Sequence, residues 1–208
     1  MLVTPAEGYR LWAPEYDASP NPLLALEARL LQDRLGVAAG DRFLDAGAGT
    51  GRWMKYAERC GARAFGIDLS AEMLAKGSGA RVRGDMRHLP VADDAADLAI
   101  CSMALGYVRS AGEVVRELAR VARRVIVSDL HPAAVAAGWT RSFRHQGQVY
   151  EIEQYCHSLR DLKPAGMRDA WFVEAPFGEP ERAIFETAGK TLDGALRVPA
   201  IGAVCWTR

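Results

Sequence analysis

The chain has 208 residues with 26 basic and 26 acidic side chains, so its formal net charge is zero. This balance gives no reason to expect a nucleic acid or an anionic membrane as a partner, and one domain accounts for the length. The four cysteines are widely spaced, which favours buried thiols in a reducing compartment, and no metal site is predicted. No signal-peptide pattern or membrane-spanning apolar run is present, so a cytoplasmic location is expected.

Apolar runs and helical patterns alternate up to residue 130. A helix is expected from Pro22 to Gly36, because Asn21 is a favourable N-cap and leucines follow at helical spacing. Further helices are predicted at 52–60, 71–77 and 110–121, the last opened by a Ser110/Glu113 capping box. Strands are predicted at 42–46, 62–68, 81–85, 96–104 and 123–130. This alternation predicts an α/β fold with a doubly wound, mostly parallel seven-stranded sheet and helices on both faces.

The pattern changes after residue 131. Residues 140–155 are typical of a hairpin with its turn near 145–148. A helix around 157–165 and strands at 168–175 and 198–206 are expected to complete the sheet.

The most informative stretch is FLDAGAGTG at 43–51, where a strand runs into Gly47, Gly49 and Gly51. Such glycines let the backbone turn sharply and approach a ligand, although each could also serve only the turn. The following helix offers free N–H groups to a carboxylate or phosphate. Arg52 occupies the position of the third glycine of a dinucleotide fingerprint, and no Walker-type loop is present.

Two acidic residues end the next two predicted strands. Asp68 is placed to accept hydrogen bonds from both hydroxyls of a ribose, or alternatively to cap a helix. Asp85 would end the strand at 81–85 and could accept a hydrogen bond from the amino group of an adenine. Met86 would then add a backbone N–H and an apolar wall.

The ordered set DAGAGTG, GIDLS and GDMRHLP, followed by VADDAADLAICSMALGYV, resembles class I S-adenosylmethionine-dependent methyltransferases. Within them it is most similar to the small-molecule branch of ubiquinone/menaquinone-biosynthesis type (methyltransferase type 11), over about residues 40–130. The resemblance implies a Rossmann-like fold, S-adenosyl-L-methionine as cofactor and methyl transfer to O, N or C of a small metabolite. The residues it implies for the cofactor are Tyr16, Asp45, Gly47, Gly49, Gly51, Asp68, Leu69, Asp85, Met86, Cys101, Ser102 and Met103.

The resemblance also divides the expected single domain. Residues 1–36 would form an N-terminal cap and helix, and 40–130 the cofactor-binding core. Residues 131–156 would be a substrate lid or insertion, and 157–208 the C-terminal part of the sheet.

Residues outside the core are candidates for the acceptor site. His131 directly follows a strand and is the candidate general base, although it could instead fix the exit of the chain. Tyr9 and Trp12 could close over the site with Tyr16, or merely pack the terminal segment onto the domain. The remaining candidates, which could equally form a satellite core or a dimer surface, are Trp139, Phe143, Arg144, Tyr150 and His157.

Two other functions stay open at this point. One is a short Rossmann-type NAD(P)-dependent oxidoreductase, which Arg52 disfavours, and the other is a cofactor-binding protein without catalysis. The chain lacks the Asn/Asp-Pro-Pro-Tyr/Phe turn of nucleic-acid amino-methyltransferases. The expected partner is therefore a small-molecule methyl acceptor, with no nucleic acid and no membrane, bound by a monomer or homodimer.

Overall fold

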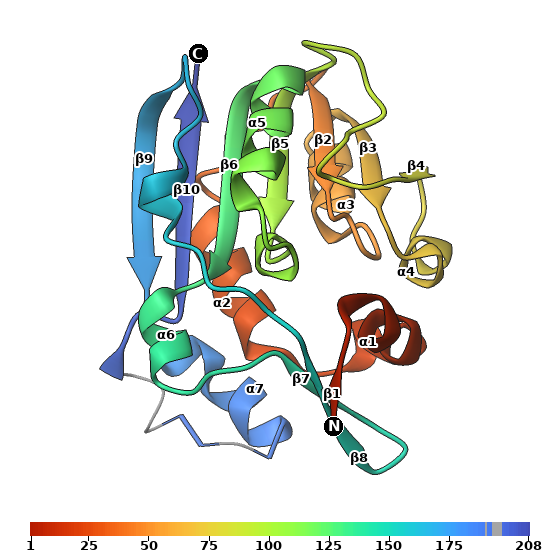
Figure 1. Ribbon diagram of the computed structural model, residues 1–208, viewed down its shortest axis with the longest axis vertical. Helices are drawn as coiled ribbons and strands as arrows, with labels where there is room; N and C mark the ends of the chain where they lie inside the picture. Colours follow the sequence, from red (N-terminus) through yellow and green to blue (C-terminus); the bar gives the residue numbers. More distant parts are fainter. Residues whose placement is uncertain (190, 193–196) are drawn as a thin grey trace.

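The computed structural model describes residues 1–189, 191–192 and 197–208. In this part of the chain the main sheet has seven strands, in the order β4-β3-β2-β5-β6-β10-β9 (Figure 1). They are β2 (Arg42–Ala46), β3 (Arg63–Asp68), β4 (Ala80–Arg83), β5 (Ala96–Ser102), β6 (Ala122–Leu130), β9 (Arg168–Ala175) and β10 (Ile201–Thr207). β10 runs antiparallel to β6 and β9, while β4, β3, β2, β5 and β6 pair in parallel. The predicted fold class is confirmed.

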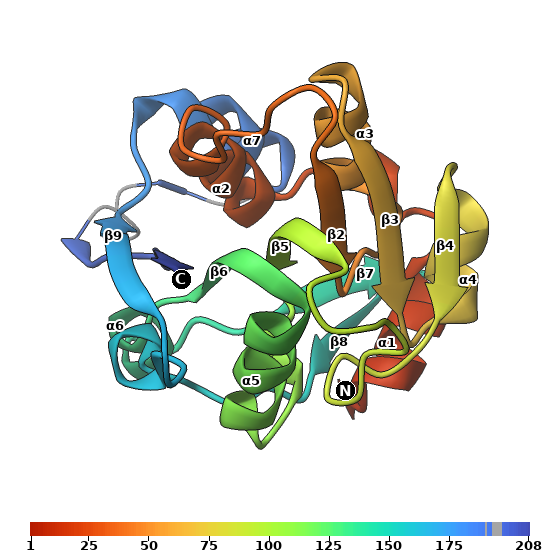
Figure 2. The ribbon, with the colours of Figure 1, turned by 90° about the horizontal axis from the view of Figure 1, so that it is seen from above.

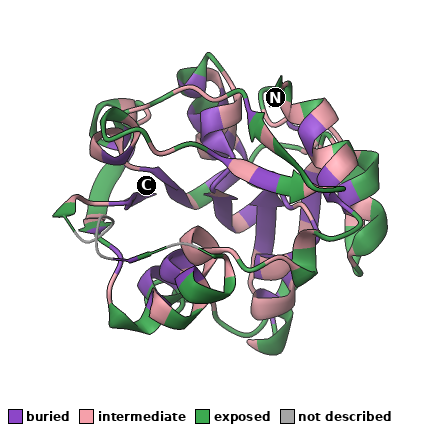
Figure 3. Ribbon diagram, turned by 90° about the horizontal axis from the view of Figure 1, so that it is seen from below, coloured by how far each residue is buried: buried purple, intermediate pink, exposed green. Residues whose placement is uncertain are grey.

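Helices cover both faces of this sheet (Figure 2). The α-helices are α1 (Pro5–Trp12), α2 (Pro22–Leu31), α3 (Arg52–Arg59), α4 (Ala71–Lys76), α5 (Ala111–Val121), α6 (Pro132–Ala136) and α7 (Arg182–Thr187). Single 3₁₀ turns are η1 (Tyr16–Ala18), η2 (Leu105–Tyr107), η3 (Leu159–Leu162) and η4 (Glu179–Glu181). α2, α3 and α7 lie on one face and α5 on the other. The central strands between them are almost entirely buried (Figure 3).

Alternation along the strands divides the core into two layers. Phe43 of β2 belongs to the layer beneath α2 and α3, together with Leu26 and Ile126. The next residue, Leu44, belongs to the layer beneath α5, together with Val114 and other apolar residues. Successive side chains of a strand point to opposite faces, so a parallel strand covered on both sides is apolar throughout. This is why the apolar runs predicted the strands.

A second, smaller sheet lies beyond the carboxyl ends of the parallel strands (Figure 1). The predicted hairpin consists of β7 (Ser142–His145) and β8 (Gln148–Ile152), and β1 (Leu2–Val3) pairs in parallel with β8. Helix α1 packs on this sheet through Trp12, which belongs to a small apolar cluster with Phe143 and Ile152. The N-terminal segment and the hairpin therefore form one unit, called the cap below (residues 1–21 and 139–155).

Some local predictions were wrong. The helix expected around 157–165 is only the 3₁₀ turn η3, because Pro164 restricts Lys163 to extended backbone and offers no N–H. Ser110 makes no side-chain cap, and its carbonyl instead accepts from the N–H of Glu113 at 3.1 Å. Strand β4 ends at Arg83, so Asp85 lies in the following loop. The segment expected at 157–208 includes residues 190 and 193–196, which lie outside the described residues.

Helix α1 was not predicted, although its sequence signal matches that of α2. Thr4 and Pro5 repeat the cap-and-proline pattern of Asn21 and Pro22, and the Thr4 side chain accepts from the N–H of Glu7 at 3.3 Å. The cap predicted at Asn21 is confirmed, since its side chain accepts from Leu23 at 3.1 Å. Within the described residues, no helix is long and apolar enough to cross a membrane.

A buried carboxylate connects α2 to the rest of the core. Glu27 is fully buried, and its Oε1 accepts from the hydroxyls of Ser102 (2.7 Å) and Ser128. Its Oε2 accepts from Nη2 of Arg52. Three donors from β5, β6 and α3 thus compensate one buried negative charge, as burial of a charge requires. This network was not predicted, although Glu27 lies on the apolar face of α2, between Leu26 and Leu30.

We expect the substitution Glu27→Ala to lower the free energy of unfolding by about 3–5 kcal/mol, because it leaves the Arg52 charge and two buried hydroxyls without their acceptor. Urea denaturation followed by circular dichroism measures this change. Glu58→Ala, at an exposed position of α3, is the matched control and should change stability by less than about 0.5 kcal/mol. A loss below about 1 kcal/mol at Glu27 would show that the network contributes little to stability.

Candidate functional site

The glycine loop between β2 and α3 adopts backbone angles that require glycine. The φ angles of Gly47, Gly49 and Gly51 are +80°, +55° and +82°, all in the left-handed region. A Cβ on Gly47 would also lie 2.6 Å from Cβ of Ala104. The N–H of Gly47 donates to the carbonyl of Ile67 at 2.7 Å, which ties the loop to β3. The loop is therefore a fixed cradle of backbone groups.

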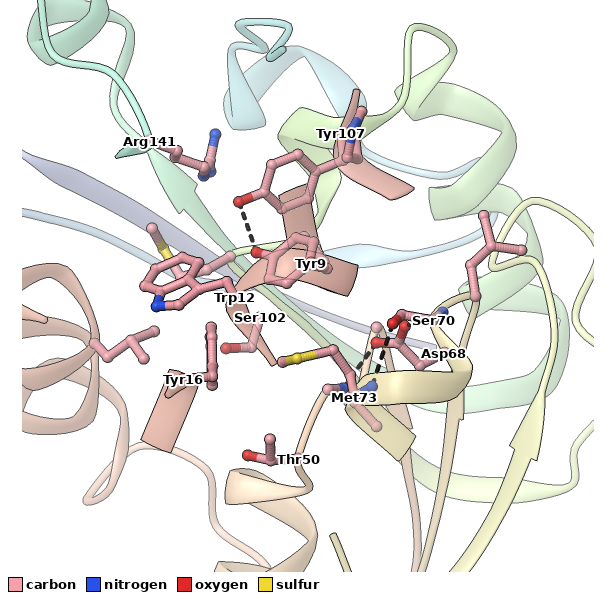
Figure 4. Close-up of a pocket in the computed structure, with 18 of the residues that line it drawn as sticks. Tyr9, Trp12, Tyr16, Thr50, Asp68, Ser70, Met73, Ser102, Tyr107 and Arg141 are labelled. Carbon is pink, nitrogen blue, oxygen red and sulfur yellow. Dashed lines mark hydrogen bonds between the residues drawn. The ribbon is translucent and has the colours of Figure 1, made fainter. Parts of the chain in front are cut away.

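Asp68 closes this cradle from the end of β3. Its Oδ2 accepts from the N–H of Gly49 at 2.8 Å and its Oδ1 from the N–H of Ser70 at 2.7 Å (Figure 4). Burial raises the pKa of Asp68, and these N–H groups oppose the rise. A carboxylate oxygen can accept more than one hydrogen bond, so both oxygens keep capacity for a ligand.

A large cavity opens beside the loop, with a volume of about 1050 Å³. This is at the upper end of the roughly 300–1,000 Å³ typical of ligand sites. Its floor is at the carboxyl ends of β2, β3 and β5, where the strand order reverses and open α/β sheets bind ligands. The cap forms its opposite wall through α1, η1 and the residues before β7.

Most of the predicted cofactor residues line this cavity. They are Tyr16, Asp45, Gly47, Gly49, Asp68, Leu69, Asp85, Met86, Ser102 and Met103. Cys101 was also expected to line the cofactor, but it lies outside this cavity. Its side chain is buried in the layer beneath α5, with Sγ 3.9 Å from Sδ of Met86. Alternation along β5 turns Ser102 toward the cavity and Cys101 away from it. Gly51 is not in the lining, and it precedes the first residue of α3 as its N-cap.

Asp85 lines the cavity, but its carboxylate, which was expected to be free to accept from an adenine, is already paired with Arg87. Both of its oxygens accept from Nε of Arg87 at 3.0 Å. This hydrogen bond lowers the pKa of Asp85, against a smaller effect of burial. Because β4 ends at Arg83, Asp85 reaches the cavity from a loop. Its lowered pKa keeps it ionised at neutral pH.

Asp45 is the buried carboxyl group beneath the loop. Burial raises its pKa to about 7, the guanidinium of Arg52 lowers it and the carboxylate of Asp68 raises it. Its Oδ1 is buried and has no hydrogen-bond partner among the described residues. Asp45 lines the cavity as a residue, but this oxygen has almost no accessible surface and is an unpaired buried group of the kind that native structures rarely contain.

The cap supplies an aromatic wall. Tyr9, Trp12 and Trp139 line the cavity as predicted, together with Tyr107 from η2. The Tyr9 hydroxyl donates to the Tyr107 hydroxyl at 2.7 Å (Figure 4), and burial raises the pKa of both phenols. The cap is joined to the glycine loop by the hydroxyl of Thr50, which donates to a carboxylate oxygen of Asp17 at 2.7 Å.

Four of the predicted acceptor residues lie outside the cavity lining. Phe143 stacks between Trp12 and Tyr150, with ring centroids 4.9 and 5.4 Å apart, and so belongs to the core of the cap. Arg144 is exposed and donates to the carbonyl of Gly147 at 3.2 Å in the hairpin turn. His157 lies 2.8 Å from the carbonyl of Val108 through Nε2.

The cation that does line the cavity is Arg141, which sequence analysis did not single out. It is buried and paired with Asp129 at the end of β6, and its Nη1 donates to Gln154 at 3.1 Å. The guanidinium lies 4.8 Å from the ring centroid of Tyr107. Burial lowers the pKa of Arg141, but the Asp129 carboxylate and its other neighbours outweigh this, so the net shift is upward.

His131 is not placed as a general base for this cavity. It caps α6, its Nδ1 accepts from the N–H of Ala133 at 3.0 Å, and its Nε2 lies 3.0 Å from Glu174 on β9. The chain exit after β6 therefore directs the ring toward the antiparallel edge of the sheet. Among the residues that the structure describes, no histidine lines the cavity.

The pKa of Asp45 has a consequence for stability. The folded protein keeps a proton that the unfolded chain releases above about pH 4, so stability present at low pH is lost as the pH rises to about 7. Relative to Asp45→Asn, we expect wild-type stability to fall by up to about 4 kcal/mol between pH 4 and pH 7, and then to level off. Urea denaturation across this range measures the difference, with Asp161→Asn as an exposed control. A difference that does not vary with pH would contradict the shift.

Known proteins resemble this chain in the same core. Residues 44–125 match a family model described as a methyltransferase domain. Over 90 residues, the chain is 34% identical to the malonyl-[acyl-carrier protein] O-methyltransferase of Pectobacterium atrosepticum, covering 41% of this chain and 36% of the relative. Over 92 residues, it is 38% identical to the demethylmenaquinone methyltransferase of Mycolicibacterium paratuberculosis, covering 43% and 40%. The chain thus matches less than half the length of either relative.

The fold is shared over a greater length. A crystal structure of an S-adenosylmethionine-dependent methyltransferase from Mesorhizobium loti matches with a TM-score of 0.67 and 21% identity, covering 88% of this chain and 97% of that one. At this identity the likeness concerns the fold. Together with the family match over the glycine loop, Asp68 and Asp85, it confirms the resemblance stated from the sequence. Residues 44–125 of this chain thus match a methyltransferase domain, and the fold around them is similar to that of S-adenosylmethionine-dependent methyltransferases.

Proposed function

We propose that this chain transfers the methyl group of S-adenosyl-L-methionine to an oxygen, nitrogen or carbon atom of a small-molecule acceptor. One observation carries the proposal: the carboxylate of Asp68 accepts a hydrogen bond from Gly49 of the glycine loop, and both residues line the same cavity. This cavity is large enough for a nucleoside and a second small molecule. The two curated relatives are named for different acceptors, so the acceptor is proposed only as a class.

The residues around the loop fit this cofactor. The carboxylate of Asp68 would accept from the ribose hydroxyls, and Leu69, whose side chain is 56% exposed, would pack on the adenine with Met86. Asp45, which lines the cavity beneath the loop, would lie near the amino-acid portion. When bound, the cofactor supplies an electrophilic methyl group on a sulfonium sulfur.

The cap would hold the acceptor and keep water away from the methyl group. Tyr9, Trp12, Tyr16 and Tyr107 present aromatic faces to the cavity, and such faces attract a sulfonium cation. Arg141 adds a fixed cation that its pairing with Asp129 holds in place. Alignment of the reacting atoms accounts for most of the catalysis that this reaction needs.

The phenols in this wall are poor general bases. Burial raises the pKa of Tyr9, Tyr16 and Tyr107, so these side chains stay protonated at neutral pH. No histidine replaces them within the described lining residues. We infer that neither a tyrosine nor a histidine among these residues serves as general base, and that orientation of the acceptor is the chain's main contribution.

Two alternative functions are less well supported. Arg52 occupies the position at which a dinucleotide fingerprint has its third glycine, and it is paired with Glu27 there. A cofactor-binding protein without catalysis would be favoured by side chains that fill the acceptor end, whereas the cavity is open between the loop and the cap.

Calorimetric titration with S-adenosylhomocysteine tests the proposal. We expect wild-type protein to bind, and Asp68→Ala to weaken binding at least tenfold, since each hydrogen bond to a charged group contributes about 1.5–3 kcal/mol. Asp161→Ala, exposed and outside the cavity, should bind like wild type. Absence of binding by wild-type protein, or equal affinity of the folded Asp68 variant, would refute the proposed function.

A further inference from the structure

Charged side chains are unevenly distributed around the cavity. All the carboxylates of the described lining belong to residues before β5, namely Glu7, Asp17, Asp45, Asp68, Glu72 and Asp85. From Ser102 at the end of β5 onward, the described lining residues include the cations Arg109 and Arg141 and no aspartate or glutamate. Hydroxyl groups on this side belong to Ser102, Tyr107, Thr140, Ser142 and Tyr155. A ligand group on this side therefore meets positive charge and hydrogen-bond donors without an opposing carboxylate in the lining.

Of the two cations, Arg141 already has its counter-ion. Its guanidinium is paired with Asp129, and the two side chains are only 6% and 5% exposed. Its Nη1 also donates to Gln154 at 3.1 Å. A buried pair of this kind carries no net charge, and each partner is needed to compensate the other. Arg141 therefore adds little net attraction for an anion.

Arg109 is the cation whose charge is not compensated. It is exposed and makes no ion pair with any residue that the structure describes. Its guanidinium carbon lies 5.1 Å from the ring centroid of Tyr155, and its Nη2 donates to the hydroxyl of that residue at 3.5 Å. An arginine has five N–H donors, so most of them stay available to a ligand.

The contacts of Tyr155 show on which side of the cavity Arg109 lies. The N–H of Tyr155 donates to the carbonyl of Gly106 at 2.7 Å, and the N–H of Gly106 donates to Asp129 at 2.6 Å. Asp129 belongs to β6, beside β5, whereas Asp68 ends β3 on the other side of β2. Arg109 is thus separated from the residues proposed to bind the nucleoside, and lies where the acceptor would bind.

We propose that the acceptor carries an anionic group, a carboxylate or a phosphate, and that Arg109 binds this group while the apolar body of the acceptor lies against the aromatic wall of the cap. This proposal rests on the proposed function and narrows its acceptor class. The planar fork of arginine matches the oxygens of either group and can form two parallel N–H···O bonds. The ring of Tyr155 supports the guanidinium through a cation–π contact.

The test uses protein saturated with S-adenosylhomocysteine, so that the cofactor end of the cavity is occupied. Three probes that share one apolar body are titrated by calorimetry: 1-naphthoate, 1-naphthyl phosphate and the neutral 1-naphthamide. We expect at least one anion to bind wild-type protein about tenfold more tightly than the amide, as for a hydrogen bond to a charged group. Arg109→Gln should reduce this difference to within about twofold and leave the affinity for the amide unchanged. Arg116→Gln, exposed on α5 and outside the described lining, is the matched control and should behave like wild type.

Tighter binding of either anion supports the proposal, and the tighter of the two identifies the group. Equal wild-type affinities for all three probes, or a preference for anions that persists in Arg109→Gln, would overturn the assignment of Arg109. Failure of all three probes to bind the saturated protein would overturn it as well. In these cases the proposed function still stands, because only failure of S-adenosylhomocysteine itself to bind would refute it.

Discussion

The architecture of the site depends on one buried negative charge. The carboxylate of Glu27 is compensated by hydroxyls from β5 and β6 and by Arg52 at the start of α3. It therefore fixes α2, the sheet and the helix after the glycine loop relative to one another. Because a lone buried charge is far costlier than a paired one, these elements are held in a single arrangement. The glycine loop and the floor of the cavity are attached to these elements and are therefore held in place as well.

Local patterns predicted the fold well, and most of the residues expected to bind the cofactor line one cavity. Strands buried on both faces are apolar throughout, and closely spaced glycines with an acidic residue after the next strand form a short-range signature. Sequence spacing also placed Asp68 and Leu69 beside the loop. Each of these features depends on neighbouring residues or on one strand-to-strand relation, which is why a single sequence was sufficient.

The acceptor side depends on contacts between distant segments, and there the prediction was less successful. Arg144 was named as a candidate and Arg141 was not, because a hairpin sequence does not reveal which face the cap buries. The odd spacing of the two residues along extended chain puts them on opposite faces. His131 follows a strand as expected. However, β10 and β9 complete the sheet beside β6, and the His131 ring contacts Glu174 of β9. Glu27 could have been recognised as a charged residue within an apolar helical stripe.

The two walls of the cavity come from different stretches of the chain. The matched family segment covers 44–125 and contains the loop, Asp68 and Asp85, whereas Tyr9, Trp12, Trp139 and Arg141 lie outside it. The matched segment thus contains the residues proposed to bind the nucleoside, and the cap residues proposed to face the acceptor lie outside it. Under the proposed function, changes at Trp139 and Arg141 would alter acceptor preference while the glycine loop and Asp68 stay unchanged.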